Sequence, residues 1–155
     1  MIAALLLLST LSSTMQIAPP TEPGERLIIT GTMLQADGRT PARNVVLFAY
    51  HTNAKGVYVQ RDGTPYGLSG HLRTDANGRF RIETIRPGGY PGRRDPAHIH
   101  LVVKHDGKPD TYVDEIIFDD DPRTSAYRGR KGYAAVRLSK RNGVWHGTHT
   151  IVLRR

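Results

Sequence analysis

The sequence of 155 residues contains no cysteine. The chain therefore forms no disulfide, builds no thiolate metal site and has no cysteine nucleophile. Any metal that it binds must take nitrogen or oxygen ligands. Apolar residues recur nowhere at convincing helical spacing, and no internal repeat is apparent. The length predicts one domain, large enough to bury roughly 68–70% of the surface of its extended chain.

The first fourteen residues carry no charged side chain, and their apolar run is too short to span a bilayer. The run is typical of the apolar core of a secretory signal, although the usual basic leader is missing. We therefore expect residues 1–25 to be a signal peptide or a disordered N-terminal arm, and residues 26–155 to be the folded domain. The proline-rich segment 17–24 is expected to be a stiff lead-in. Export predicts a secreted or periplasmic protein, and the alternative is a cytoplasmic one.

Charge is unevenly distributed along the chain, whose formal net charge is +8. Residues 104–121 hold seven acids and two lysines, whereas residues 122–155 hold nine Lys or Arg and no acid. A basic tail can indicate a nucleic-acid partner. Here, however, strand-like and turn residues separate the cations, and no nucleic-acid motif accompanies them. We expect a solvated basic face, paired in part with the acidic segment, and no nucleic-acid partner.

Short runs rich in Val, Ile, Phe and Thr alternate with turn residues. The runs span residues 26–33, 44–50, 79–83, 98–104, 113–118 and 149–153. The dipeptides suited to positive φ are Asp37-Gly38, Asp62-Gly63, Asn77-Gly78, Asp106-Gly107 and Asn142-Gly143. Many short strands with regular turns predict an all-β fold, namely an antiparallel β-sandwich in a single domain.

Two histidines open the apolar run at residue 98. His98 and His100 are two positions apart in an expected strand, so both side chains project from one face, with Cα atoms about 7 Å apart. Ile99 and Leu101 then point the other way, toward a core. Two imidazoles on one side of a rigid strand are a good metal pair, although an ordinary exposed strand face shows the same pattern. Tyr90 lies on a loop rich in glycine and proline, from which its phenol can reach the same point.

A wider pattern surrounds these residues. It comprises GTM at 31–33, DG at 37–38, PARNVVL at 41–47, GVY at 56–58, RTDANGRFRIETIRPGGY at 73–90 and PAHIH at 96–100. This pattern resembles the intradiol ring-cleavage dioxygenases, a family of non-haem ferric enzymes, over roughly residues 28–122. The tyrosine-proline pair followed by PAHIH is its most specific part. The family also implies a β-sandwich, in agreement with the strand pattern.

The resemblance implies four ligands to Fe(3+), Tyr58, Tyr90, His98 and His100, with a solvent hydroxide completing the shell. It makes Tyr90 and His100 axial, and Tyr58 and His98 equatorial. Spacing alone does not choose Tyr58 over Tyr50 and Tyr66; the Gly-x-Tyr pattern at 56–58 favours it. The remaining histidines are explained as solvated or hydrogen-bonded side chains: His51, His71, His105, His146 and His149.

The resemblance also implies an activity, the cleavage of a catechol-type ring between its two hydroxyl-bearing carbons. Both atoms of O2 enter the product, a muconate-type diacid, without flavin, nicotinamide or haem. Tyr90 would leave the iron when the catechol binds and would accept one of its protons. A glycine-rich loop suits such a movement. The implied partners are a small catechol and O2, and the oligomeric state stays open.

The sequence departs from the family pattern at two positions. The residue before PAHIH is usually Arg, whose charge stabilises the substrate, and here it is Asp95, with Arg94 and Arg93 just upstream as replacements. Glu115 stands where the family often has Gln. Two acids near the site would repel a carboxylated catechol unless Arg93 or Arg94 offsets them, so the expected substrate is a neutral catechol or a larger molecule. The chain also lacks the long N-terminal helical region of dimeric catechol dioxygenases, so family rules for oligomeric state do not transfer.

The alternative class is a non-catalytic sandwich of the carboxypeptidase-regulatory or transthyretin-like type. Such modules share the turn chemistry at residues 37–38 and 74–78 and bind no metal. Tyr58, His98 and His100 favour the enzyme, because a bare module has no use for them.

Overall fold

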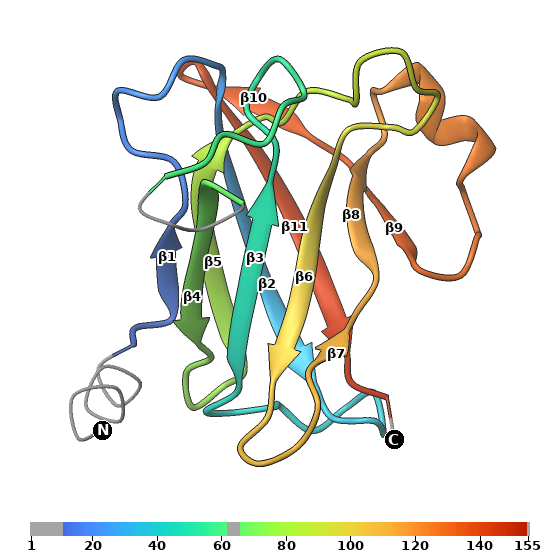
Figure 1. Ribbon diagram of the computed structural model, residues 1–155. Coiled ribbons are helices and arrows are strands. Elements are labelled where there is room, and N and C mark those ends of the chain that lie inside the picture. The colour runs from blue at the N-terminus through green and yellow to red at the C-terminus, as the bar shows by residue number, and fades with distance from the viewer. Residues whose placement is uncertain (1–10, 62–65, 155) are drawn as a thin grey trace.

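The computed structural model describes residues 11–61 and 66–154, which form two β-sheets packed face to face (Figure 1). The predicted all-β sandwich is confirmed. The five-stranded sheet has the order β1 (Thr14–Gln16), β5 (Arg79–Ile85), β2 (Arg26–Leu34), β11 (Val144–Val152) and β10 (Ser139–Arg141). The expected turn at Asp62-Gly63 and the first ten residues of the expected signal lie outside the described residues.

The second sheet carries the histidine-bearing strand at its centre. Its order is β4 (Leu68–Arg73), β3 (Val46–His51), β6 (His98–Lys104), β8 (Glu115–Phe118) and β9 (Tyr133–Val136), and β7 (Thr111–Tyr112) also pairs with β6. A short 3-10 helix, η1 (Pro122–Ala126), connects β8 to β9. Among the described residues no helix is long and apolar enough to cross a membrane.

The sheets are mixed and not wholly antiparallel as predicted. The pairs β1–β5, β11–β2 and β8–β9 run parallel. Parallel neighbours need a long connection, because a tight hairpin reverses the chain. The segment between β8 and β9, which includes η1, is such a connection. The wide sequence separation of β2 and β11 likewise allows the last strand to lie beside an early one.

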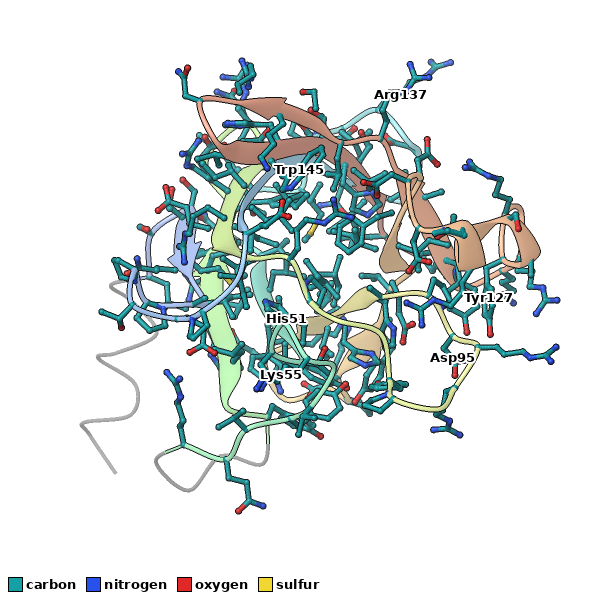
Figure 2. All side chains as sticks on the ribbon, turned by 90° about the horizontal axis from the view of Figure 1, so that it is seen from above. His51, Lys55, Asp95, Tyr127, Arg137 and Trp145 are labelled. Atoms are coloured by element: carbon teal, nitrogen blue, oxygen red, sulfur yellow. The ribbon has the colours of Figure 1, made fainter. Side chains whose placement is uncertain are left out.

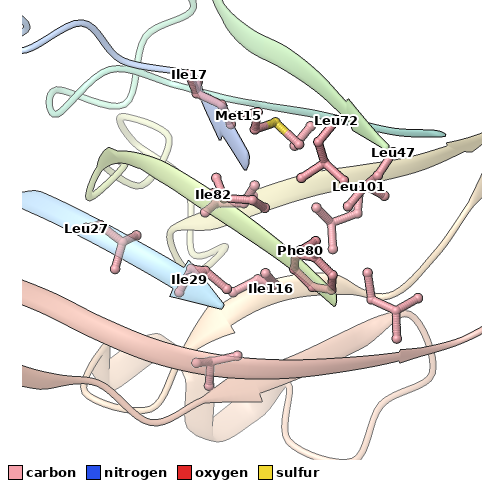
Figure 3. Packing of buried hydrophobic residues seen from close by; sticks show 14 of the residues in the cluster. Met15, Ile17, Leu27, Ile29, Leu47, Leu72, Phe80, Ile82, Leu101 and Ile116 are labelled. Carbon is pink, nitrogen blue, oxygen red and sulfur yellow. The ribbon is translucent and has the colours of Figure 1, made fainter. Parts of the chain in front are cut away.

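The core fills the space between the sheets with alternate residues of each strand (Figure 3). Leu27 and Ile29 of β2 and Ile99 and Leu101 of β6 belong to this core, and all four are fully buried. Each buried aliphatic side chain of this size contributes roughly 1.5–3 kcal/mol relative to an exposed one. Because Ile99 and Leu101 anchor β6 in the core, the even-numbered residues of this strand are fixed on its outer face.

The N-terminal segment contributes to this core. Met15 of β1, Ile17 and Ala18 are buried against it, and β1 pairs with β5. The sandwich therefore starts before residue 26, where the sequence analysis set its boundary. Met15 and Ile17 supply the apolar area that makes this ordering favourable.

Candidate metal centre

His98 and His100 lie together on the outer face of β6. Their Nε2 atoms are 3.1 Å apart and their rings are perpendicular. His98 is 9% exposed and His100 is half-buried. The prediction from strand alternation, that both histidines project from one face of the strand, is confirmed.

Two tyrosines from separate loops complete the cluster. The hydroxyls of Tyr58 and Tyr90 are 2.8 Å apart. The Tyr58 hydroxyl is 3.0 Å from Nε2 of His100, and the Tyr90 hydroxyl is 3.1 Å from Nε2 of His98 and 3.4 Å from that of His100. Four polar atoms from three segments therefore face one another within hydrogen-bond distance.

The other two tyrosines near this point have a different role. Tyr50 pairs with His100 across β3 and β6, and its ring stacks on the His100 ring at 4.4 Å. Tyr66 packs on Tyr50 at 4.1 Å. In the part of the chain that the structure describes, neither hydroxyl contacts the two Nε2 atoms. Both rings instead form an aromatic wall beside the cluster, which spacing could not distinguish from the cluster itself.

Hydrogen bonds at the opposite ring nitrogens decide which histidine atoms face inward. Nδ1 of His98 donates to the carbonyl of Pro96 at 2.9 Å. Nδ1 of His100 is 2.7 Å from the Glu115 carboxylate. Both partners are acceptors, so each Nδ1 carries a proton and each Nε2 of a neutral ring presents a lone pair. These contacts also fix the ring orientations, as the hydrogen-bond partners of metal-bound histidines commonly do.

The four inward atoms suit a cation. Without one, the phenolic protons of Tyr58 and Tyr90 satisfy the two lone pairs. Tyr58 and Tyr90, once deprotonated, and the Nε2 atoms of His98 and His100 would offer a trivalent ion two phenolates and two imidazoles. Ionising a free tyrosine at pH 7 costs roughly 4 kcal/mol, which the charge of a bound ion can supply. The donor set is hard and anionic, as ferric iron requires.

Glu115 also approaches the histidines, since its carboxylate and the two rings bring ligand atoms within 4.8 Å of one another. Its hydrogen bond to Nδ1 of His100 makes it a partner of that ring and leaves Nε2 facing the other three donor atoms. Burial raises the pKa of Glu115, but the hydrogen bond from His100 and the electrostatic influence of the two histidines outweigh it, so the pKa lies below its ordinary value. The acid at this position is therefore bound to a histidine, a role that the sequence did not reveal.

Burial, and then the hydrogen bond to Tyr90, raise the pKa of Tyr58 well above its usual value. Tyr58 is therefore neutral without a metal.

The loops that carry the two tyrosines are packed against each other. The amide of Gly88 donates to the carbonyl of Asn53 at 2.9 Å, and the Thr52 hydroxyl donates to the carbonyl of Gly88 at 2.8 Å. Gly56 has a φ of +80°, and a Cβ there would lie 1.9 Å from the carbonyl oxygen of Gly89. Only glycine allows this approach.

The three charged residues before PAHIH lie at the edge of the cluster. Asp95 accepts a hydrogen bond from the Tyr127 hydroxyl at 3.0 Å. The guanidinium of Arg93 is 5.9 Å from the centre of the Tyr90 ring and 3.8 Å from the Asp95 carboxylate, and its side chain is 70% exposed. Arg94 is exposed. The structure thus brings Arg93 near Tyr90 and leaves Arg94 in solvent.

Arg123 was not anticipated by the sequence analysis. Its guanidinium covers Gly89, where a Cβ would lie 2.5 Å from its nearest nitrogen. Its Nε also donates to Asp121 at 3.2 Å, and Asp121 accepts the amide of Ala97 at 2.9 Å. Asp121 and Arg123 thus hold the segment between Tyr90 and His98 from the side of η1. No motif marks such contacts, because they depend on where η1 lies.

Comparisons with known proteins agree on one kind of enzyme. A family model described as "Dioxygenase" matches residues 9–127. The chain is 37% identical over 111 residues to the protocatechuate 3,4-dioxygenase beta chain of Burkholderia cepacia, covering 64% of this chain and 47% of that one. It is 34% identical over 132 residues to catechol 1,2-dioxygenase of Acinetobacter baylyi, covering 70% and 42%. The chain thus spans less than half the length of these two relatives.

Solved structures give the same result. Catechol 1,2-dioxygenase from Acinetobacter sp. ADP1, inhibited by bound mercury, superposes with a TM-score of 0.74 at 27% identity, covering 93% of this chain and 57% of that one. The dioxygenase domain of a carbohydrate-binding fusion protein from Streptomyces sp. SirexAA-E superposes with a TM-score of 0.72 at 26% identity, covering 89% and 85%.

Proposed function

This chain belongs to the intradiol ring-cleavage dioxygenase family, and from that premise we propose that it is a non-haem Fe(3+) dioxygenase. The proposed reaction opens a catechol-type ring between its two hydroxyl-bearing carbons. One O2 is consumed per ring, and both oxygen atoms enter a muconate-type diacid.

We propose Tyr58, Tyr90, His98 and His100 as the ligands of the iron. The observation that carries this proposal is the convergence of their four donor atoms, with separations of 2.8 to 3.4 Å between the bonded pairs. When bound, the ferric ion supplies Lewis acidity to the catechol oxygens and the capacity to draw electron density from the ring. Glu115 and the carbonyl of Pro96 keep the two imidazoles aimed at it.

Tyr90 is the proposed acceptor of a substrate proton. Its hydroxyl lies within hydrogen-bond distance of the Tyr58 hydroxyl and of Nε2 of both histidines, so it lies at the centre of the cluster. As a phenolate it can take one of the two protons that a catechol must lose. Tyr58, which has Tyr90 and His100 as partners, then stays in place. A proton acceptor positioned in this way contributes typically 10²–10⁴-fold to a rate.

The charges around the cluster favour a neutral catechol as substrate. Glu115 contacts His100, and Asp95 acts electrostatically on Glu115; Tyr127 holds the Asp95 carboxylate in place. Of the two arginines considered from the sequence, Arg93 lies closer to Tyr90, and we propose it as the cation that stabilises the bound ring. Solvent and the nearby Asp95 carboxylate screen the charge of Arg93, so Arg93 would attract a substrate carboxylate only weakly.

The non-catalytic module remains the alternative class, and no comparison supports it. A carboxypeptidase-regulatory or transthyretin-like module would leave the four converging donor atoms unexplained.

Oxygen uptake tests the proposed activity. Iron-loaded protein should consume one O2 per catechol and produce an acid that absorbs in the ultraviolet. Catechol should react faster than 3,4-dihydroxybenzoate, whose carboxylate meets the acids near the site. The matched control is the double variant His98→Ala/His100→Ala, which should show no uptake. Iron-loaded protein that consumes no O2 with either catechol would contradict the proposal.

A further inference from the structure

A second cleft lies on the outer face of the five-stranded sheet. Its volume is about 480 Å³, and its walls include Thr30, Arg81, Arg137, Arg141, His146 and Thr148. Thr30 pairs with Arg81 on one side and with Thr148 on the other, so the three side chains form a row across β5, β2 and β11. Their neighbours Ile29, Ile82 and Gly147 are buried on the opposite face. The row therefore faces outward.

The cleft is strongly cationic. Three arginines and one histidine line it. Glu83 bonds Arg81 at 2.8 Å. Arg137 and Arg141 are exposed, and within the described ranges no acid pairs with either. Partial burial, and then the charges of Arg141 and Arg81, lower the pKa of His146. Like charges gathered in this way repel one another, and an anion between them relieves the repulsion.

The cleft is separate from the metal centre. The proposed ligands come from β6 of the other sheet and from loops beside it. Figure 2 shows Arg137 on one side of the molecule and His51 and Asp95 on the other. Nothing in the proposed ring cleavage uses these arginines.

We propose that this cleft binds a small, multiply charged phosphate-type oxyanion. Guanidinium groups and hydroxyls, here from Thr30, Thr148 and Ser139, are the donors that phosphate oxygens take up best. In the described part of the chain, no aromatic ring other than His146 lines the cleft, so a nucleobase would find no stacking surface there. Glu83 pairs with Arg81 beside the cleft, and this acid would repel a long polyanion that extended past Arg81 along β5, which favours a compact ligand.

Calorimetric titration of the full-length protein with inorganic triphosphate tests this proposal. We expect one site per chain, with triphosphate bound more tightly than orthophosphate. The double variant Arg137→Gln/Arg141→Gln should weaken binding about tenfold or more, because each residue supplies a charge-assisted contact. The single variants Arg137→Gln and Arg141→Gln should each weaken binding in part. Their control is Arg43→Gln, an equal change of charge at an exposed arginine outside the cleft, which should leave the affinity unchanged.

Each of the following results would overturn the proposal. Absence of saturable binding would do so, as would equal weakening by Arg43→Gln, which would indicate general charge attraction. Binding that survives the arginine changes but is lost in His100→Ala would place the anion at the metal centre. A parallel titration with vesicles containing phosphatidic acid distinguishes the source of the phosphate. Binding to vesicles without binding to free triphosphate would make the cleft a lipid-contacting surface and would contradict a small-anion site.

Discussion

At the scale of single residues, the metal centre depends on which nitrogen of each histidine faces the tyrosines. The carbonyl of Pro96 and the carboxylate of Glu115 set this choice by accepting the two Nδ1 protons. Glu115 therefore acts through His100, as a positioning residue. Its own charge also offsets part of the charge of a bound cation.

We predict that Glu115→Ala lowers iron affinity about 10–100-fold, the usual cost of losing a partner of a metal-bound histidine. Glu115→Gln should retain much of the affinity, because its amide oxygen can still accept the Nδ1 proton. The control is Asp114→Ala, which removes the neighbouring acid that pairs with Arg154. Competition with a coloured chelator measures the affinity, and equal losses at positions 114 and 115 would contradict the positioning role.

The two tyrosines should respond differently to loss of their hydroxyls. Tyr90→Phe should keep its iron through the other three ligands yet turn over at least 10²-fold more slowly, because no phenolate accepts the substrate proton. Tyr58→Phe should chiefly weaken iron binding and change the visible spectrum. Iron content and oxygen uptake of both variants decide the matter. Wild-type oxygen uptake by Tyr90→Phe would rule out the proton-accepting role.

Part of this site could be predicted from the sequence, and part could not, because it depends on how distant elements pack. Strand alternation is enough to put His98 and His100 on one face. It says nothing about Tyr50, whose ring stacks on the His100 ring with 4.4 Å between their centres. The partner of His100 depends on how β8 lies beside β6, and no local pattern encodes that register.

At the scale of elements, the position of the tyrosines depends on the close contact between their loops. Gly56 and Gly89 meet so tightly that no side chain fits at Gly56. The hydrogen bonds from the Gly88 amide to Asn53 and from the Thr52 hydroxyl to Gly88 keep the two loops in register. A change at Gly56 should therefore disturb Tyr58 and Tyr90 together.

We predict that Gly56→Ala loses more stability and more iron than Gly38→Ala. Both glycines have positive φ, +80° and +68°, so both substitutions carry a similar backbone cost of about 1–2 kcal/mol. Only at Gly56 does the new methyl meet another backbone, whereas Gly38 has open space around it. Urea unfolding and iron content measure the difference. Indistinguishable variants would show that the loop contact does not hold the tyrosines.

The strands that the sequence predicted are those with strong patterns. β2, β3, β5, β6 and β8 lie within a few residues of the expected runs, and the expected run at 149–153 is the end of β11. β4, with the sequence LSGHLR, and β9, with YAAV, were missed. Their glycine, serine and alanine residues have low β-propensity, and they are strands because β3 and β8 supply the hydrogen-bond partners.

At the scale of the whole molecule, one buried histidine joins the two sheets. His51 ends β3, and its Nε2 is 2.7 Å from the hydroxyl of Thr84 on β5 of the other sheet. Its Nδ1 is 2.6 Å from the carbonyl of Thr52, so the ring is neutral with Nδ1 protonated and Nε2 accepting. Burial lowers the pKa of His51 to about 4. Protonation would remove the acceptor on which the contact between sheets depends.

His51 predicts how stability changes with pH. An unfolded histidine has a pKa near 6.5, so the unfolded chain binds a proton in a range where the folded chain does not. Stability from this residue is complete above about pH 6.5, falls as the pH drops toward 4 and then levels off. The loss is about 3 kcal/mol. Urea unfolding of metal-free protein between pH 7 and 4.5 measures it. His51→Gln should show a shallower slope, and a slope equal to that of wild type would contradict the assignment.

The N-terminal segment links the fold to the export hypothesis, which stays a prediction. Because Met15 and Ile17 pack in the core, a processing site after residue 17 would remove both from the sandwich.

The basic residues between positions 122 and 155 were expected to form a solvated face. Part of that face is now the cationic cleft at Arg137 and Arg141.

The central claim is that Tyr58, Tyr90, His98 and His100 hold ferric iron, and the visible spectrum tests it most directly. Purified protein loaded with ferric iron should be red-brown from tyrosinate-to-iron charge transfer, with one iron per chain by metal analysis. His98→Ala and His100→Ala should each lose most of the iron and the colour. Wild-type protein that stays colourless and iron-free after loading, or full iron occupancy in both histidine variants, would contradict the account.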